Sequence, residues 1–251
     1  MLGKKINTHV IVRAIYFRPK QSPSRRGDCF VAKNKSAPRN DILLLILISL
    51  LISSCSTSTP PPTPQVVSVF SSAAAEPWLN KLYDCAAKQN NVVLSRADDS
   101  NAAEIVLQIG ESTITSFAYQ IDTEEILIVA QRQSPVQNLT IDDARALFMG
   151  SRDPSVQVWV YASDADVQRA FDQLVMKGGS VTSSAMAAAN PQQMSDTLVN
   201  QPNTVGILPK HWKAGAGDAR VVFSAGTVPV LALTRNQPEG IVKELLACLQ
   251  K

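Results

Sequence analysis

The sequence contains little that could carry catalysis. It has two histidines, His9 and His211, and only His211 lies after residue 54. The Gly-x-Ser-x-Gly turn that presents a nucleophilic serine is missing. Metal-ligand spacings and the glycine-rich loop that cradles phosphate groups are missing too. His211, next to Trp212, is expected in a surface turn, and we expect no enzyme, no cofactor and no metal site.

The apolar run at residues 42–52 is too short to cross a membrane. A transmembrane helix needs about 20 apolar residues, and this run, apolar except for Ser49, fits the centre of a secretory signal instead. The following residues, Ile52-Ser-Ser-Cys55, resemble the lipobox of bacterial lipoproteins. That resemblance implies removal of residues 1–54 and lipid attachment to Cys55. The alternative is a buried helix with an unrelated cysteine.

Charge divides the chain at the same place. Residues 1–54 hold ten Lys/Arg and two acids, a formal charge of +8, whereas residues 55–251 hold 14 Lys/Arg and 19 Asp/Glu, a formal charge of −5. An acidic mature part without a basic stripe is not expected to bind nucleic acid. The basic leader is long, so either translation starts at Val31, or residues 1–30 form a cytoplasmic extension.

Residues 55–65 are expected to form a tether. They are small, polar and rich in proline, a composition that forms an extended spacer rather than a core. A lipid on Cys55 followed by such a spacer implies an extracytoplasmic protein anchored to the bacterial cell membrane. The folded part then begins near Val66.

The remaining residues alternate between strand-like and helix-like patterns, which predicts an α/β fold. The expected strands are at 66–70, 91–94, 103–109, 126–130, 156–161, 205–208, 221–223 and 228–233. The expected helices are at 73–88, 141–148, 164–177, 191–200 and 238–250.

Two segments resemble the phosphate-type periplasmic substrate-binding proteins of ABC transporters. Residues 134–150 (SPVQNLTIDDARALFMG) resemble that family's turn into a helix ending Phe-x-Gly, and residues 203–209 (NTVGILP) resemble a later strand. The resemblance implies the type II periplasmic-binding-protein fold, with two α/β lobes, two crossing strands and a central cleft. The implied lobes are 66–125 plus 225–251 and 126–224. The implied partners are a small-molecule solute and an ABC permease, and the protein is expected to be a monomer.

The sequence departs from the family where phosphate would bind. The family has a Gly-Ser-Gly-Thr-Arg turn, whereas residues 161–169 read YASDADVQR. Asp164 and Asp166 place negative charge where an anion would lie, so phosphate is disfavoured. Ser163 and these acids also form a good helix cap, which leaves a capping role and a ligand role open.

Hydroxyls at expected lobe edges are the other ligand-binding candidates. Ser71 and Ser72 precede the first helix and either cap it or donate to a ligand. Ser112 and Thr113 follow a strand, and Ser183 follows the long second-lobe helix. Arg169 either faces the cleft or is a solvated helix charge.

Cys85 and Cys248 both fall on expected helices of the first lobe. Outside the cytoplasm such a pair can form a disulfide, and the alternative is two buried thiols.

Two functions are consistent with these observations. The first is a lipid-anchored solute-binding protein of an ABC-type uptake system that captures a small polar or anionic solute. The second is a binding-fold lipoprotein that acts in envelope sensing or protein–protein contact. A cleft with convergent polar groups would favour the first, and one filled by large apolar side chains the second.

Overall fold

The computed structural model describes residues 63–112 and 117–251. The chain divides into two units, residues 1–59 and 60–251, and the description below concerns the second. The expected leader, Cys55 and all of the tether before residue 63 lie outside the described residues. Among the described residues, no helix is both long and apolar enough to cross a membrane.

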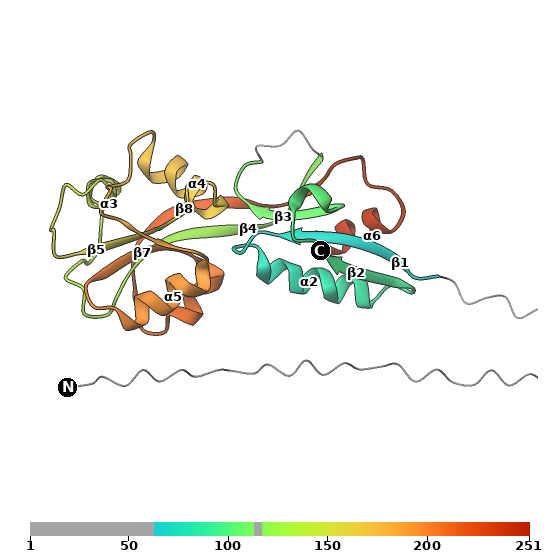
Figure 1. Cartoon of the computed structure of the whole chain (residues 1–251), viewed down its shortest axis with the longest axis horizontal. Helices are drawn as coiled ribbons and strands as arrows, with labels where there is room; N and C mark the ends of the chain where they lie inside the picture. Colours follow the sequence, from blue (N-terminus) through green and yellow to red (C-terminus); the bar gives the residue numbers. More distant parts are fainter. Residues whose placement is uncertain (1–62, 113–116) are drawn as a thin grey trace, which may run out of the picture. The chain divides into compact units, whose positions relative to one another are not determined.

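One mixed sheet of eight strands organises this unit, in the order β2-β1-β3-β8-β4-β7-β5-β6 (Figure 1). Its strands are β1 (Gln65–Ser71), β2 (Val92–Arg96), β3 (Ile105–Ile109), β4 (Phe117–Ala130), β5 (Gln157–Tyr161), β6 (Met186–Ala188), β7 (Thr204–Pro209) and β8 (Arg220–Thr234). The α-helices are α2 (Glu76–Ala87), α3 (Ile141–Phe148), α4 (Asp166–Phe171), α5 (Pro191–Asn200) and α6 (Gly240–Leu249). Short 3-10 turns span Ser100–Ala102 and Lys210–Ala216.

The two long strands β4 and β8 pair antiparallel along their whole length and join two groups of elements (Figure 1). Strand β3 pairs with the end of β8 at residues 230–233, while β7 pairs with the end of β4 at residues 126–130. We call β1–β3 with α2 and α6 the first lobe, and β5–β7 with α3–α5 the second lobe. The lobe boundaries expected at residues 125 and 225 fall inside the two long strands and stay a prediction.

Both long strands correct the sequence expectation. Strand β4 begins at Phe117 rather than at residue 126, and β8 is continuous where two short strands were expected. The missed half of β4 holds Asp122, Glu124 and Glu125, which do not match an apolar strand pattern. Pairing with β8 satisfies the backbone N–H and C=O groups there in spite of the acidic side chains. The neighbouring strand, rather than the local residue pattern, therefore decides the conformation.

Helix α3 forms where its sequence predicts it, because both ends are specified locally. The Thr140 hydroxyl accepts from the backbone N–H of Asp143, and the Asp143 carboxylate accepts in return from the backbone N–H of Thr140, which is a capping box. Gly150 ends the turn with φ +77°, and its N–H donates to the carbonyl of Leu147.

Substituting Gly150 tests this helix end. The left-handed backbone costs a non-glycine residue about 1–2 kcal/mol, and a Cβ at Gly150 would lie 2.8 Å from the Thr182 hydroxyl. Gly150→Ala should therefore lower the free energy of unfolding by about 2–3 kcal/mol, measured by urea unfolding. Gly178→Ala is the matched control, since Gly178 has φ +90° with nothing within 4 Å of its Cβ. Equal losses in both variants would show that the clash with Thr182 contributes nothing.

The long helix expected at 164–177 is shorter and changes type. Helix α4 runs from Asp166 to Phe171 and continues as a π-helix through Met176, and Lys177 ends it with φ 47°. The N-cap position is Ala165, without a side-chain cap, so Ser163 does not take the capping role, which was one of the two left open for it. Strand β6 was not expected at all, because its three residues, Met-Ala-Ala, carry no strand pattern.

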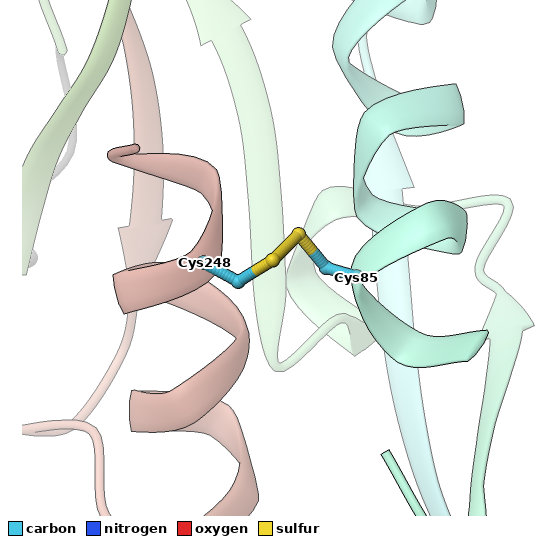
Figure 2. The surroundings of a disulfide bond; sticks show 2 residues. All are labelled: Cys85 and Cys248. Atoms are coloured by element: carbon cyan, nitrogen blue, oxygen red, sulfur yellow. A yellow bond between two sulfur atoms is a disulfide. The ribbon is translucent and has the colours of Figure 1, made fainter. Parts of the chain in front are cut away.

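A disulfide joins Cys85 of α2 to Cys248 of α6 (Figure 2). Their Cα atoms lie 6.0 Å apart, and the two cysteines are 163 positions apart in sequence. The bond ties the last helix of the chain to the first helix of the first lobe. Trp78, Leu79 and Leu82 of α2 and Leu245 of α6 are buried in the core beside it.

Candidate functional site

A polar cleft of about 400 Å³ lies between the two lobes. The first lobe contributes the end of β1, the turn that follows it and β3, whereas the second lobe contributes the turns before α4 and α5. Its polar lining residues are Ser72, Ser100, Gln108, Asp164, Asp166, Arg169 and Asn190, and its larger apolar and aromatic ones are Phe70, Val106, Tyr161, Val167 and Pro191. Polar residues of both lobes line the cleft, so a polar molecule would find hydrogen-bonding groups on both walls.

Ser72 lies in the turn between β1 and α2, and its hydroxyl faces the second lobe. Its Oγ accepts from the backbone N–H of Ala75 at 3.3 Å and donates to Asp166 Oδ2 at 2.5 Å. The two roles that the sequence left open for Ser72 were capping the helix and donating a hydrogen bond to a ligand. The hydroxyl closes the turn before α2 and also points at a partner across the cleft.

Asp166 is the most connected acid of the cleft. Its side chain is buried, and Oδ2 accepts from the Ser72 hydroxyl and, at 3.0 Å, from the backbone N–H of Ile109. Both donors belong to the first lobe. Its other oxygen accepts from the backbone N–H of Val167 at 2.9 Å. One carboxylate of the second lobe is thus held by two donors of the first.

Asp164 and Arg169 form the more exposed wall of the cleft. The Arg169 guanidinium donates to the backbone carbonyl of Asp164, which fixes it beside the turn. Arg169 is half-buried and Asp164 is exposed. Both line the cleft, so Arg169 is the cation that a solute would meet there.

Asn190 closes the second-lobe wall at the start of α5. Its side chain accepts from the backbone N–H of Gln193 at 2.9 Å, and Pro191 occupies the first turn. The Asn190 oxygen is therefore used as a helix cap, whereas its amide N–H groups point to no partner among the described bonds. The Asn-Pro start of this helix was recognisable in the sequence, although Asn190 was not chosen as a site residue.

Of the residues chosen from sequence, Ser72, Asp164 and Arg169 line the cleft. Ser71 is buried and donates to the carbonyl of Ser72, away from the cleft. Ser163 is exposed and Ser112 half-buried, and neither lines the cleft. Ser183 is exposed in a loop whose neighbour Thr182 lies against the end of α3. Thr113 lies outside the described residues.

A second polar cluster lies where β4 crosses between the lobes. Glu124 is buried, and its Oε2 lies 2.6 Å from Nδ1 of His211, whose ring packs against Trp78 with centroids 4.5 Å apart. Burial raises the pKa of Glu124 above its ordinary 4.5, while the charge and hydrogen bond of His211 act against that rise. His211 is exposed in the 3-10 turn Lys210–Ala216, as expected from the sequence, and its ring also pairs with the buried acid Glu124, which the sequence did not predict.

The described residues contain no group of three or more His, Cys, Asp or Glu side chains that could hold a metal ion. The polar groups of the cleft are hydroxyl, amide, carboxylate and guanidinium. Such groups recognise a solute by hydrogen bonds and charge.

No protein-family model matches the sequence, and no curated protein matches it. Solved structures do match. A structure from Clostridium perfringens, assigned as a phosphate ABC transporter substrate-binding protein with bound phosphate, has TM-score 0.66 and 13% identity, covering 74% of this chain and 93% of that one. An ABC-type phosphate transport receptor from Vibrio cholerae has TM-score 0.56 and 15% identity, with the same coverages.

Regulatory domains share the architecture. The reduced form of the OxyR2 regulatory domain from Vibrio vulnificus has TM-score 0.59 and 10% identity, covering 76% of this chain and 97% of that one. Identities this low establish the fold alone. The chain has the type II periplasmic-binding-protein fold, as its sequence predicts.

Proposed function

We propose that this protein is a membrane-anchored, extracytoplasmic solute-binding lipoprotein of an ABC-type uptake system. The observation that carries the proposal is the polar cleft between two lobes that are joined by β4 and β8. Its volume of about 400 Å³ falls in the range of small-molecule sites. Two lobes on paired connecting strands can close on a solute by a hinge motion.

The membrane anchor in this proposal rests on the sequence. The lipobox-like Ile52-Ser-Ser-Cys55 and the proline-rich spacer after it suit a folded unit held outside the membrane by a lipid. A permease in the same membrane would take up the solute that the cleft releases. The Clostridium perfringens and Vibrio cholerae proteins, which have the same fold, are named for phosphate transport.

A second function is favoured by one specific contact. Asp166 ties the second lobe to Ser72 and Ile109 of the first, and a tie of this kind suits a sensing or protein-contact role. Regulatory domains such as that of OxyR2 share the fold. The two functions differ in one observable property, which is whether a small solute binds in the cleft.

A thermal-shift screen of the full-length, detergent-solubilised protein distinguishes them. Its tryptophans, Trp78, Trp159 and Trp212, lie in the folded unit, so their fluorescence reports unfolding. We expect amino acids, sugars or other small polar solutes to include one that raises the melting temperature further as its concentration rises. Cooperative melting without a shift for any solute class would contradict the transport function and favour sensing or protein contact.

A further inference from the structure

We propose that the Asp166 carboxylate occupies a site whose donors suit an oxyanion, so that this protein rejects inorganic oxyanions and takes a polar solute of another class. The inference rests on the solute-binding function proposed above and narrows its solute class. It is carried by the contacts of one side chain that reaches from the second lobe into the first.

The donors around Asp166 are those that an oxyanion would use. The Ser72 hydroxyl donates to Oδ2 at 2.5 Å and the Ile109 N–H donates to the same oxygen at 3.0 Å. Short O–H···O⁻ contacts of this kind are charge-assisted and strong. Because Ser72 Oγ also accepts from the N–H of Ala75, its own proton is directed at the carboxylate. Two independent donors of the first lobe therefore converge on one point.

The negative charge at this point is balanced by neutral donors. Among the described ion pairs, none joins Asp166 to a lysine or arginine. The nearby Arg169 instead donates to the carbonyl of Asp164. A buried carboxylate requires compensation, and here it comes from a hydroxyl and from backbone N–H groups. These donors would serve a free oxyanion equally well.

A capping role does not account for the position of Asp166. It follows the N-cap residue Ala165, and α4 has no side-chain cap. Only the hydrogen bond from the Val167 N–H is local. The two hydrogen bonds to Oδ2 come from Ser72 and Ile109, which lie 94 and 57 positions earlier in the sequence. A phosphate or sulfate at this point would have to displace the carboxylate from its donors and would meet a like charge.

Removing the carboxylate should create oxyanion binding. We expect inorganic phosphate and sulfate to leave the melting temperature of the wild-type, full-length protein unchanged. Asp166→Ala should bind one of them at least about tenfold more tightly than the wild type, because both the competing group and the like charge are gone. Isothermal titration calorimetry and thermal shift give the two measurements.

Three further variants make the test specific. Asp164→Ala is the matched control, since it removes the same charge from an exposed position of the same turn, and it should not gain binding. Asp166→Ala combined with Ser72→Ala should lose the gained binding, because one converging donor is removed. Asp166→Ser replaces Asp166→Ala in both experiments if the alanine variant does not fold, since serine keeps a polar group at the buried position.

The outcomes separate this inference from the proposed function. Oxyanion binding by the wild type, no gain in a folded Asp166 variant, an equal gain in Asp164→Ala, or a gain that survives Ser72→Ala would each overturn the inference. A gain specific to Asp166 variants supports it, even if the solute screen of the wild type finds nothing and the transport function fails.

Discussion

Replacing Cys85 and Cys248 together by alanine is expected to lower the free energy of unfolding by about 4–5 kcal/mol. The disulfide closes a loop of 163 residues, and a cross-link across so long a loop removes much of the conformational freedom of the unfolded chain. Packing changes little, because alanine keeps the Cβ of each residue. The expected fall in melting temperature is about 10 °C or more for a unit of this size.

Urea unfolding of the full-length protein measures this effect. The wild type treated with a reducing agent is the matched control, and it should unfold at the same urea concentration as the alanine double variant. Oxidised wild type and double variant with the same unfolding midpoint would contradict the stabilising role of the bond. A reduced wild type that stays as stable as the oxidised protein would contradict it equally.

Replacing His211 by alanine is expected to cost about 2–3 kcal/mol of stability near pH 8. Leaving a buried polar group without its hydrogen-bond partner typically costs about 1–3 kcal/mol, and more for a charged group, and His211 is the side-chain partner of Glu124. The cost arises at Glu124, whose buried carboxylate would keep its charge without its partner. Urea unfolding at several pH values measures it.

The stability of the protein should depend on pH through Glu124. Burial raises the pKa of Glu124, so between its ordinary value of 4.5 and the raised value the folded protein holds a proton that the unfolded chain has released. Stability therefore falls as pH rises through that window. Without His211 the side-chain hydrogen bond that opposes this rise is lost, and the pKa of Glu124 rises further. The loss of unfolding free energy caused by His211→Ala, relative to the wild type, should therefore grow from pH 5 to pH 8.

A double variant isolates the contribution of Glu124. Glutamine has the same shape as glutamate and no charge, so Glu124→Gln combined with His211→Ala should be less destabilised at pH 8 than His211→Ala alone. The growth of the deficit with pH should also vanish in the double variant. A deficit of His211→Ala that is constant with pH would show that lost packing against Trp78, rather than the charge of Glu124, explains the effect.

Sequence reasoning predicted most of the fold because local signals define most elements. Helix α3 has its capping box and terminal glycine, and α5 has an Asn-Pro start, so both were predicted with their observed bounds. The longest stretches that were missed are in β4 and β8, where acidic or small residues interrupt the apolar pattern. There the partner strand imposes the strand conformation. The residue pattern of one segment carries no information about such a partner.

The site was predicted less well, for a different reason. Ser72 and Asp164 were predicted because they lie in turns before helices, and Arg169 was predicted on the helix that follows. All three line the cleft. The bond between Ser72 and Asp166 was missed, since it joins residues 94 positions apart. Spacing in the sequence cannot show which acid of a pair such as Asp164 and Asp166 turns inward. The path of the backbone into α4 decides that.

Hydrogen–deuterium exchange would show whether a small polar solute binds between the lobes. The full-length protein would be compared with and without a solute that raises its melting temperature. We predict slower exchange confined to the cleft segments, residues 70–74, 106–108, 161–169 and 189–191, because bound solute suppresses local opening there. Slower exchange only in segments away from the cleft would contradict binding between the lobes.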